Sequence, residues 1–320
     1  MSSHVLRGFR GSDLPAQTRA CVSCQATRRH KHRVLHVMLL FAALKAITVS
    51  AGRSLEQSQT PQNSDVDSLN FALNLEYIQA EFYSCAATGR PIPDDLRGGG
   101  PPSTGCKRAN LTQAGQAFAS ELAEDELNHI KDLQMILGAL AAPIPQLNIG
   151  TAFAEAGNLA FNATLDPSFS PYIDDIFLYQ GAFLFEDVGV TALQGLLLGI
   201  KSESYRHMLD RIMAVEAYHG GVVRTLLYQT HDTMTPYNIP LDDAVQKLAL
   251  LRGKIGAGNG HGIVNDTASS MGERAILVAA DSQGLAYQRN PLQAIAILTL
   301  GAGSNGGGFF PNGLSGSIPS

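Results

Sequence analysis

Two short stretches, Glu126-Leu-Asn-His129 and Glu216-Ala-Tyr-His219, decide how this chain folds. In each, a carboxylate and an imidazole stand three residues apart, so on a helix both side chains leave the same face. Apolar residues continue that face on both sides at spacings of three and four. This periodicity predicts two amphipathic helices whose buried faces each carry a polar pair at the centre.

Two further helical stretches carry a single glutamate on their apolar face. Four ionised glutamates in one core would repel one another and lose their hydration, whereas two bound metal ions would compensate both effects. One Glu from each of two helices, with Glu-x-x-His from each of the other two, is the ligand set of ferritin-like di-iron and di-manganese bundles. The sequence therefore predicts two iron ions, or manganese, held by Glu76, Glu126, His129, Glu186, Glu216 and His219. The alternative interpretation of either Glu-x-x-His pair alone is a contact on a partly exposed helix face.

The predicted helices and their connections indicate an all-α fold. The four main helices are expected at about residues 65–88, 112–140, 172–199 and 205–230. Ser64 or Asp65 is expected to cap the first of them and Thr112 the second. A moderate loop, a long Pro- and Gly-containing connection with one helical turn near 153–159, and a short loop give two antiparallel hairpins joined by a crossover. That is the connectivity of a ferritin-like four-helix bundle.

Composition divides the chain into five parts. They are a targeting leader (1–51), a linker (52–63), the bundle (64–232), a C-terminal helical extension (233–300) and a Gly-rich tail (301–320). Helices within the extension are expected at residues 241–254, 268–288 and 292–300. In the tail, Phe309 and Phe310 are expected to pack against the bundle.

The leader has the features of a targeting segment. Residues 1–51 contain eight of the 23 Lys and Arg residues but one of the 28 Asp and Glu residues. An apolar stretch interrupted by His36 and Lys45 then ends in Val49-Ser50-Ala51. This order predicts a secretory signal peptide, with a transit peptide for a plastid or other organelle, or a start at Met38, as alternatives. We therefore expect a secreted protein with no stable membrane span in its mature form.

The rest of the chain is acidic in balance. This argues against nucleic-acid binding, which requires clustered Lys and Arg, and suits a protein whose partners are metal ions. The sequence leaves the oligomeric state open.

Two cysteines and three sequons bear on the compartment. Cys85 and Cys106 bracket a Gly- and Pro-rich loop between the first two helices. In an oxidising compartment they would form a disulfide, and when reduced they would be small apolar side chains. The predicted N-glycosylation sites of a secreted chain are Asn110, Asn162 and Asn265.

Several stretches outside the Glu-x-x-His pairs have a recognisable pattern. They are Leu75-Glu-Tyr-Ile-Gln-Ala-Glu-Phe-Tyr83, Ala109-Asn-Leu-Thr112, Val222-Val-Arg-Thr-Leu-Leu-Tyr228, Ala279-Ala-Asp281, Leu285-Ala-Tyr287 and Gly307-Gly-Phe-Phe-Pro-Asn-Gly313. From about residue 64 to 313 the chain resembles the desiccation-related proteins of plants and algae, a branch of the ferritin-like superfamily. The resemblance implies a four-helix domain, secretory targeting and a role in water stress, but no established reaction. The wider superfamily holds two metals with its buried carboxylates and histidines. The spacing from Glu76 to Tyr83 also resembles that of ferritins, whereas Leu193 stands where a third-helix tyrosine would correspond.

Three hypotheses of function follow. The first is a di-metal protein that oxidises metal or removes peroxide, in which the glutamates of the two Glu-x-x-His pairs bridge the ions. The second is a non-catalytic protective or structural stress protein without functional metal. The third is a binding module that uses Phe309 and Phe310 to dock a partner.

Overall fold

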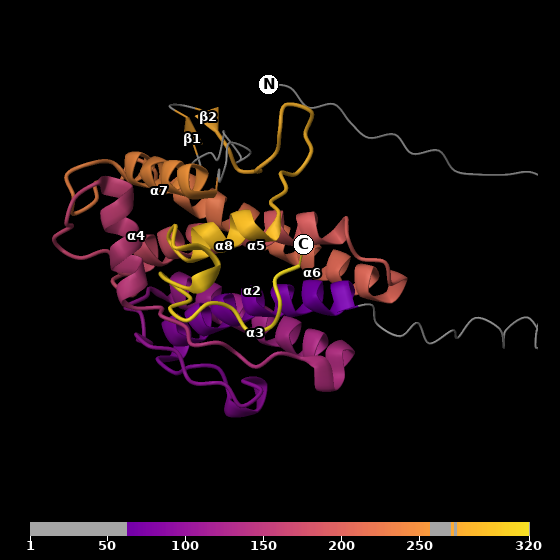
Figure 1. The fold of residues 1–320 in the computed structure, drawn as a ribbon. Helices are drawn as coiled ribbons and strands as arrows, with labels where there is room; N and C mark the ends of the chain where they lie inside the picture. The colour runs from indigo at the N-terminus through magenta and orange to yellow at the C-terminus, as the bar shows by residue number, and fades with distance from the viewer. Residues whose placement is uncertain (1–62, 257–269, 272–273, 320) are drawn as a thin grey trace, which may run out of the picture. The chain divides into compact units, whose positions relative to one another are not determined.

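The computed structural model describes residues 63–256, 270–271 and 274–319 (Figure 1). The predicted leader, the linker before residue 63 and the Asn265 sequon lie outside the described residues. The bundle consists of α2 (Asn63–Thr88), α3 (Gln113–Leu137), α5 (Asp175–Leu197) and α6 (Glu203–Gln229). The predicted all-α fold is confirmed: in the described residues, strands are limited to two pairs of residues.

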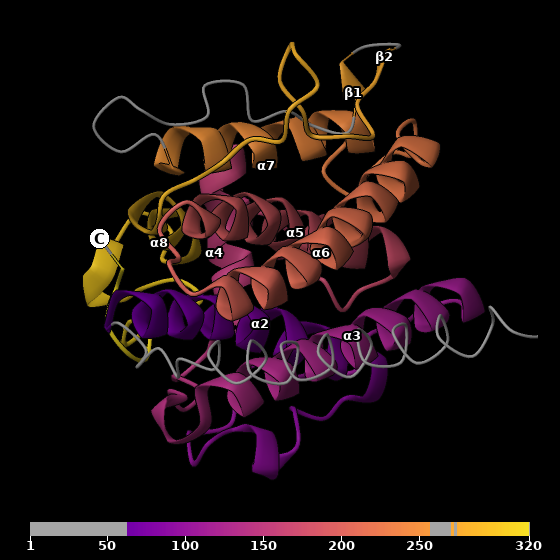
Figure 2. The ribbon, with the colours of Figure 1, turned by 90° about the vertical axis from the view of Figure 1, so that its right-hand side faces the viewer.

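The bundle is made of two antiparallel helix pairs. In the first pair, the side-chain amide of Asn70 in α2 donates to the carbonyl oxygen of Leu140, just beyond the end of α3. At the opposite end, Gln116 in α3 donates to the carbonyl oxygen of Ala87 in α2. The second pair, α5 and α6, is joined by residues 198–202. Figure 2 shows the two pairs lying against each other, with α7 (Leu241–Gly256) on the side of α5 and α6 away from α2 and α3.

The helix caps confirm one expectation and correct another. The hydroxyl oxygen of Thr112 accepts from the backbone N–H of Gly115, as an N-cap residue does. Asp65 is not the cap of α2, because the helix already begins at Asn63. Its carboxylate accepts from the backbone N–H groups of Lys201 and Ser202 at 3.1 and 2.9 Å. Asp65 therefore ties the start of α2 to the turn between α5 and α6.

The connection between the two hairpins contains more helix than expected. Instead of a single turn, α4 (Thr151–Phe161) has eleven residues. The buried ring of Phe153 in α4 contacts Phe82 of α2 and Phe185 of α5 at centroid distances of 5.5 and 5.4 Å. The crossover thus contributes a buried ring to the core of the bundle, which an exposed loop would not do.

The C-terminal extension differs from the prediction in its middle part. The expected helix over 268–288 is wrong: β1 (Ser270–Met271) pairs antiparallel with β2 (Arg274–Ala275), and residues 276–290 are not helical. Gly284 has φ +79°, which a right-handed helix cannot include, and the carboxylate of Asp281 accepts from backbone N–H groups two and four residues on. The helix resumes as α8 (Pro291–Leu298), which begins with a capping box.

A buried ionic cluster fixes this extension to the bundle. The carboxylate of Asp187 in α5 accepts from Arg224 in α6 at 3.0 and 2.6 Å and from Arg252 in α7 at 2.9 Å. Arg289, just before α8, donates to the hydroxyl oxygen of Thr191 at 2.7 Å. These contacts join α5, α6, α7 and the segment before α8, directly beside the predicted ligand Glu186.

The tail is packed and does not offer a free aromatic surface. Phe309 and Phe310 are 2% and 0% exposed. The ring of Phe309 lies 4.8 Å from that of Phe185 and 4.9 Å from that of Phe153. The expected packing against the bundle is confirmed, and the hypothesis that these two rings dock a partner is wrong because neither is accessible.

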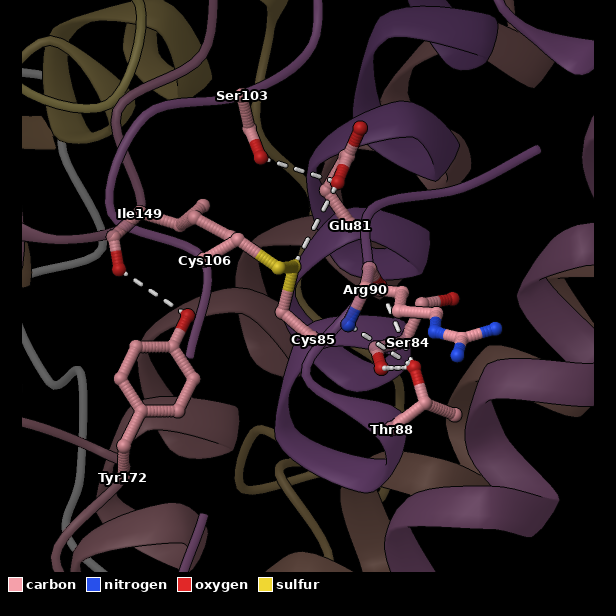
Figure 3. The surroundings of a disulfide bond; sticks show 9 residues. All are labelled: Glu81, Ser84, Cys85, Thr88, Arg90, Ser103, Cys106, Ile149 and Tyr172. Atoms are coloured by element: carbon pink, nitrogen blue, oxygen red, sulfur yellow. Dashed lines mark hydrogen bonds between the residues drawn. A yellow bond between two sulfur atoms is a disulfide. The ribbon is translucent and has the colours of Figure 1, made fainter. Parts of the chain in front are cut away.

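Cys85 and Cys106 form the predicted disulfide, with their Cα atoms 5.2 Å apart (Figure 3). The buried carboxylate of Glu81 lies beside it and accepts from the hydroxyl of Ser103 at 3.0 Å. Asn110 and Asn162 are exposed. Among the described helices, only α5 has the length and hydropathy of a membrane span, and most of that stretch is buried inside the bundle.

Candidate metal centre

All six residues predicted as metal ligands meet in the centre of the bundle. Each of the four bundle helices contributes at least one of them. The exposed fractions are 0% for Glu76, Glu126 and Glu216, 1% for Glu186, 7% for His129 and 5% for His219. The alternative interpretation, a partly exposed helix-face contact, does not agree with this burial.

The six side chains form two overlapping groups of four. One contains Glu76, Glu126, His129 and Glu216, and the other contains Glu126, Glu186, Glu216 and His219. Within each group the candidate ligand atoms lie within 4.8 Å of one another. Glu126 and Glu216 belong to both groups, which is the arrangement expected of carboxylates that bridge two ions.

The imidazoles lie on either side of the shared carboxylates. Nδ1 of His129 is 3.0 Å from Oε2 of Glu76 and 3.2 Å from Oε1 of Glu216. Nδ1 of His219 is 3.3 Å from Oε1 of Glu126 and 3.7 Å from Oε2 of Glu186. The two rings are 6.3 Å apart between centroids, and each belongs to one of the two groups.

Many of these polar atoms have no hydrogen-bond partner. They are Oε1 of Glu76, both carboxylate oxygens of Glu126, Oε2 of Glu186, Oε1 of Glu216 and Nδ1 of His219. Buried polar atoms nearly always have a partner, so this concentration of unpaired ligand atoms marks a place that could hold a cation. Carboxylate oxygens with imidazole nitrogens suit iron or manganese, and the residues therefore fit the implied metals.

The electrostatics of the cluster also favour cations. Burial, and next the neighbouring Glu216, raise the pKa of Glu76 and of Glu186 well above the ordinary value. Burial alone would raise the pKa of Glu126 too, but the imidazoles of His129 and His219 outweigh it and lower that pKa to about 2. Without metal, protons must therefore reduce the charge of the cluster, and metal binding would displace them.

The pKa values of the two histidines change in the direction opposite to the effect of burial. Burial would lower them, but the surrounding carboxylates raise the pKa of His219 to about 11 and that of His129 further. The carboxylates thus favour the protonated form of both imidazoles when no metal is bound. Each would lose a proton on becoming a metal ligand.

The comparison with known families agrees with this geometry. The family model described as a ferritin-like domain matches residues 64–229, which include all six residues of the cluster. The chain belongs to the ferritin-like family. This ferritin-like chain is 30% identical over 274 residues to the desiccation-related protein PCC13-62 of Craterostigma plantagineum, covering 83% of this chain and 87% of that protein. It is 27% identical over 271 residues to the ferritin-like catalase Nec2 of Nesocodon mauritianus, covering 80% and 85%. No solved structure matches.

Three residues around the cluster of this ferritin-like protein support the ligands. Gln79 donates to Oε2 of Glu216 at 2.7 Å, and the hydroxyl of Tyr83 donates to Oε1 of Glu186. Oδ2 of Asp125 lies 3.1 Å from Nε2 of His219, the ring nitrogen that faces away from the cluster. Such contacts fix the orientation of ligands and increase the basicity of a metal-bound histidine.

The sequence analysis noted Tyr83 but missed Gln79 and Asp125. The available signals were weak: Gln79 lies one turn after Glu76, and Asp125 directly precedes Glu126. Gly189 in α5 belongs to the same surroundings. A Cβ atom there would lie 3.0 Å from Oε1 of Gln79, so glycine leaves room for the amide that orients Glu216.

Proposed function

We propose that this protein binds two iron or manganese ions in the candidate metal centre and uses them to remove hydrogen peroxide. One observation carries the proposal: six buried ligand side chains form two overlapping groups that share Glu126 and Glu216. The similarity to a protein named a ferritin-like catalase supports peroxide as the substrate. Oxidation of iron(II) at the same site is the related alternative.

Each of the six side chains would have one role in the centre. Glu126 and Glu216 would bridge the ions, Glu76 and Glu186 would be terminal carboxylates, and each histidine would bind one ion. When bound, the metal pair supplies the electrons that are exchanged with peroxide.

Neighbouring residues orient the ligands and control access to them. The amide of Gln79 fixes one carboxylate oxygen of Glu216. Asp125, whose side chain is 41% exposed, contacts His219 from the solvent side. The edge of the centre at the two histidines, which are 7% and 5% exposed, is therefore where a small molecule such as peroxide would enter.

Metal analysis and oxygen evolution test the proposal together. After reconstitution with iron(II) or manganese(II) and removal of free metal, the protein is expected to retain about two ions per chain. It should also evolve oxygen from peroxide. Glu126→Gln should lose both properties, and Glu81→Gln, a change at a buried glutamate outside the centre, should keep both.

Two results would contradict the proposal. A protein that retains no transition metal would overturn the metal centre. A protein that retains two ions but consumes neither peroxide nor iron(II) would overturn the reaction and favour the non-catalytic protective function.

We also propose that the protein is secreted. Exposed Asn110 and Asn162, and a disulfide at Cys85 and Cys106, support this compartment. Peptide mapping of protein from its own tissue should find the disulfide linked and N-glycans on both asparagines. Free thiols and unmodified asparagines would place the protein in a reducing compartment instead.

A further inference from the structure

Three aromatic side chains connect the metal centre with one end of the bundle. The hydroxyl of Tyr83 contacts the predicted ligand Glu186. The ring of Tyr83 is 6.0 Å from that of Phe118 in α3, and Phe118 is 5.2 Å from Tyr179 in α5. Both contacts are edge-to-face, with interplanar angles of 79° and 88°. The three rings thus form a continuous contact across three helices.

The last of these three rings lines a groove. Tyr179 lies in the wall of an open groove of about 570 Å³, at the place where α3 and α5 begin and α6 ends. Sites for small organic ligands have volumes of about 300–1,000 Å³. The lining residues are Asn110, Leu111, Thr112, Asp174, Asp175, Ile176, Tyr179, Leu226, Gln229 and Thr230. The series of three rings therefore ends where a small molecule has room to bind.

The lining determines which small molecule suits the groove. Leu111, Ile176 and Leu226 provide apolar surface for a ring, and the side-chain amide of Gln229 provides a hydrogen-bonding partner. The acidic side chains of Asp174 and Asp175 line the same groove and make it unfavourable for anions. A neutral aromatic ligand with a polar substituent fits these features better than an anionic reductant does.

We infer that the groove binds a neutral phenol and that Tyr179, Phe118 and Tyr83 pass electrons from it to the metal centre. Tyrosine is one of the few side chains that can be oxidised and reduced reversibly by one electron, and it stands at both ends of the relay. The phenylalanine between them shortens the gap that the electron must cross. This inference rests on the proposed peroxide chemistry and adds a second substrate to it.

The reaction balances as a peroxidase reaction. Each of two phenol molecules loses one electron through the relay and one proton to the solvent in the groove, and becomes a phenoxyl radical. The two electrons and two protons cleave the O–O bond of one hydrogen peroxide molecule and yield two water molecules. Hydrogen peroxide is the oxidant, and the phenol replaces the second peroxide molecule that is oxidised to oxygen in a catalase reaction.

The alternative interpretation is that the three rings only pack. Edge-to-face pairs are common in cores and stabilise them without any redox role. Two features go beyond packing: one terminal hydroxyl contacts a metal ligand, and the other terminal ring lines an open groove.

The test uses guaiacol, a simple phenol, with metal-loaded full-length protein and peroxide. Guaiacol oxidation and oxygen evolution are measured in the same sample. Tyr179→Phe preserves the ring packing and is expected to lower the ratio of guaiacol oxidation to oxygen evolution about tenfold. The matched control is Tyr205→Phe, a change at a half-buried tyrosine near the start of α6, and it should leave that ratio unchanged. An unchanged ratio in Tyr179→Phe would overturn the relay.

A second measurement does not depend on the metal. Binding of guaiacol to metal-free protein, followed by NMR, is expected in the wild type and in Tyr179→Phe. It should be lost in Gln229→Trp, because the exposed position 229 lines the groove and an indole there would fill it. A protein that evolves oxygen but binds no guaiacol would overturn the groove alone. A protein that binds guaiacol but consumes no peroxide would overturn the proposed function, and the peroxidase reaction with it.

Discussion

Replacing Glu126 and Glu216 by leucine is expected to abolish the stabilisation by metal without unfolding the protein. Both side chains are fully buried, and both belong to the two overlapping groups, so the double substitution removes two ligands from each. Both positions continue an apolar helix face, where leucine is a natural residue. The metal-dependent and metal-independent effects of the change can therefore be separated.

The size of each effect follows from the structure. An ion present at about 100 times its Kd stabilises the folded state by about 2.7 kcal/mol. For a domain of this size that corresponds to a rise in Tm of about 5–11 °C per ion. Without metal, the double variant loses the hydrogen bond from Gln79 to Glu216, which costs about 1–3 kcal/mol because the buried amide of Gln79 is left without this acceptor. It also removes two of four buried carboxylates that repel one another, which offsets this cost because His129 and His219 can then become neutral. The metal-free variant should therefore be as stable as the metal-free wild type, or more stable.

Differential scanning calorimetry under anaerobic conditions, with and without iron(II) or manganese(II), measures both effects. The wild type should show a Tm that rises with the logarithm of metal concentration, and the double variant should show no rise. Glu81→Gln is the control, because Glu81 is equally buried in α2 but belongs to neither group. A wild-type metal shift in the double variant would refute the assignment of these two glutamates as ligands.

Three further predictions concern the rest of the bundle. Asp187→Asn removes the charge that two buried arginines share and should cost about 3–5 kcal/mol in chemical denaturation, whereas a cost under about 1 kcal/mol would show that the cluster is dispensable. Replacing both Cys85 and Cys106 by alanine opens a loop with a sequence separation of 21 and should cost about 3 kcal/mol, measured in the same way under oxidising conditions. Burial raises the pKa of Glu81 from 4.5 to about 7, so the unfolded chain loses this proton before the folded protein does. The free energy of unfolding of the wild type, relative to Glu81→Gln, should therefore fall by about 3 kcal/mol as the pH rises from 4.5 to 7, and a difference that does not vary with pH would contradict the shift.

The sequence was most informative where a local pattern has one physical explanation. A carboxylate and an imidazole at helical spacing, centred on an apolar helix face, either are buried together or lie on a face that is partly exposed. That reasoning sufficed to predict that all six residues of the metal centre lie together, and that the helices connect as a ferritin-like bundle. The helix predicted over 268–288 failed because propensity was the only signal there, and Gly284 adopts a backbone conformation that a helix excludes.

Contacts between segments that are far apart in the sequence produce no such pattern in it. Asp65 could be a cap or a tie between helices, and only the position of the turn at Lys201 decides between them. Tyr83 was visible as a spacing from Glu76, but its partner Phe118 and the groove beside Tyr179 depend on how three helices pack. Sequence reasoning thus found the six candidate ligands, and the structure was needed to show which residues surround them.

Glu186 and Asp187 show how the structure separates a functional buried charge from a structural one. They are adjacent in α5 and almost equally buried. Both carboxylate oxygens of Asp187 accept from arginines, and its pKa is lowered to about 2 because those arginines outweigh the effect of burial. Glu186 has one oxygen without a hydrogen-bond partner, and burial raises its pKa. A charge whose partners are all supplied by the protein stabilises the fold. A buried carboxyl group left with an unpaired oxygen among three similar groups destabilises the fold, which is the arrangement expected of a residue that binds an ion.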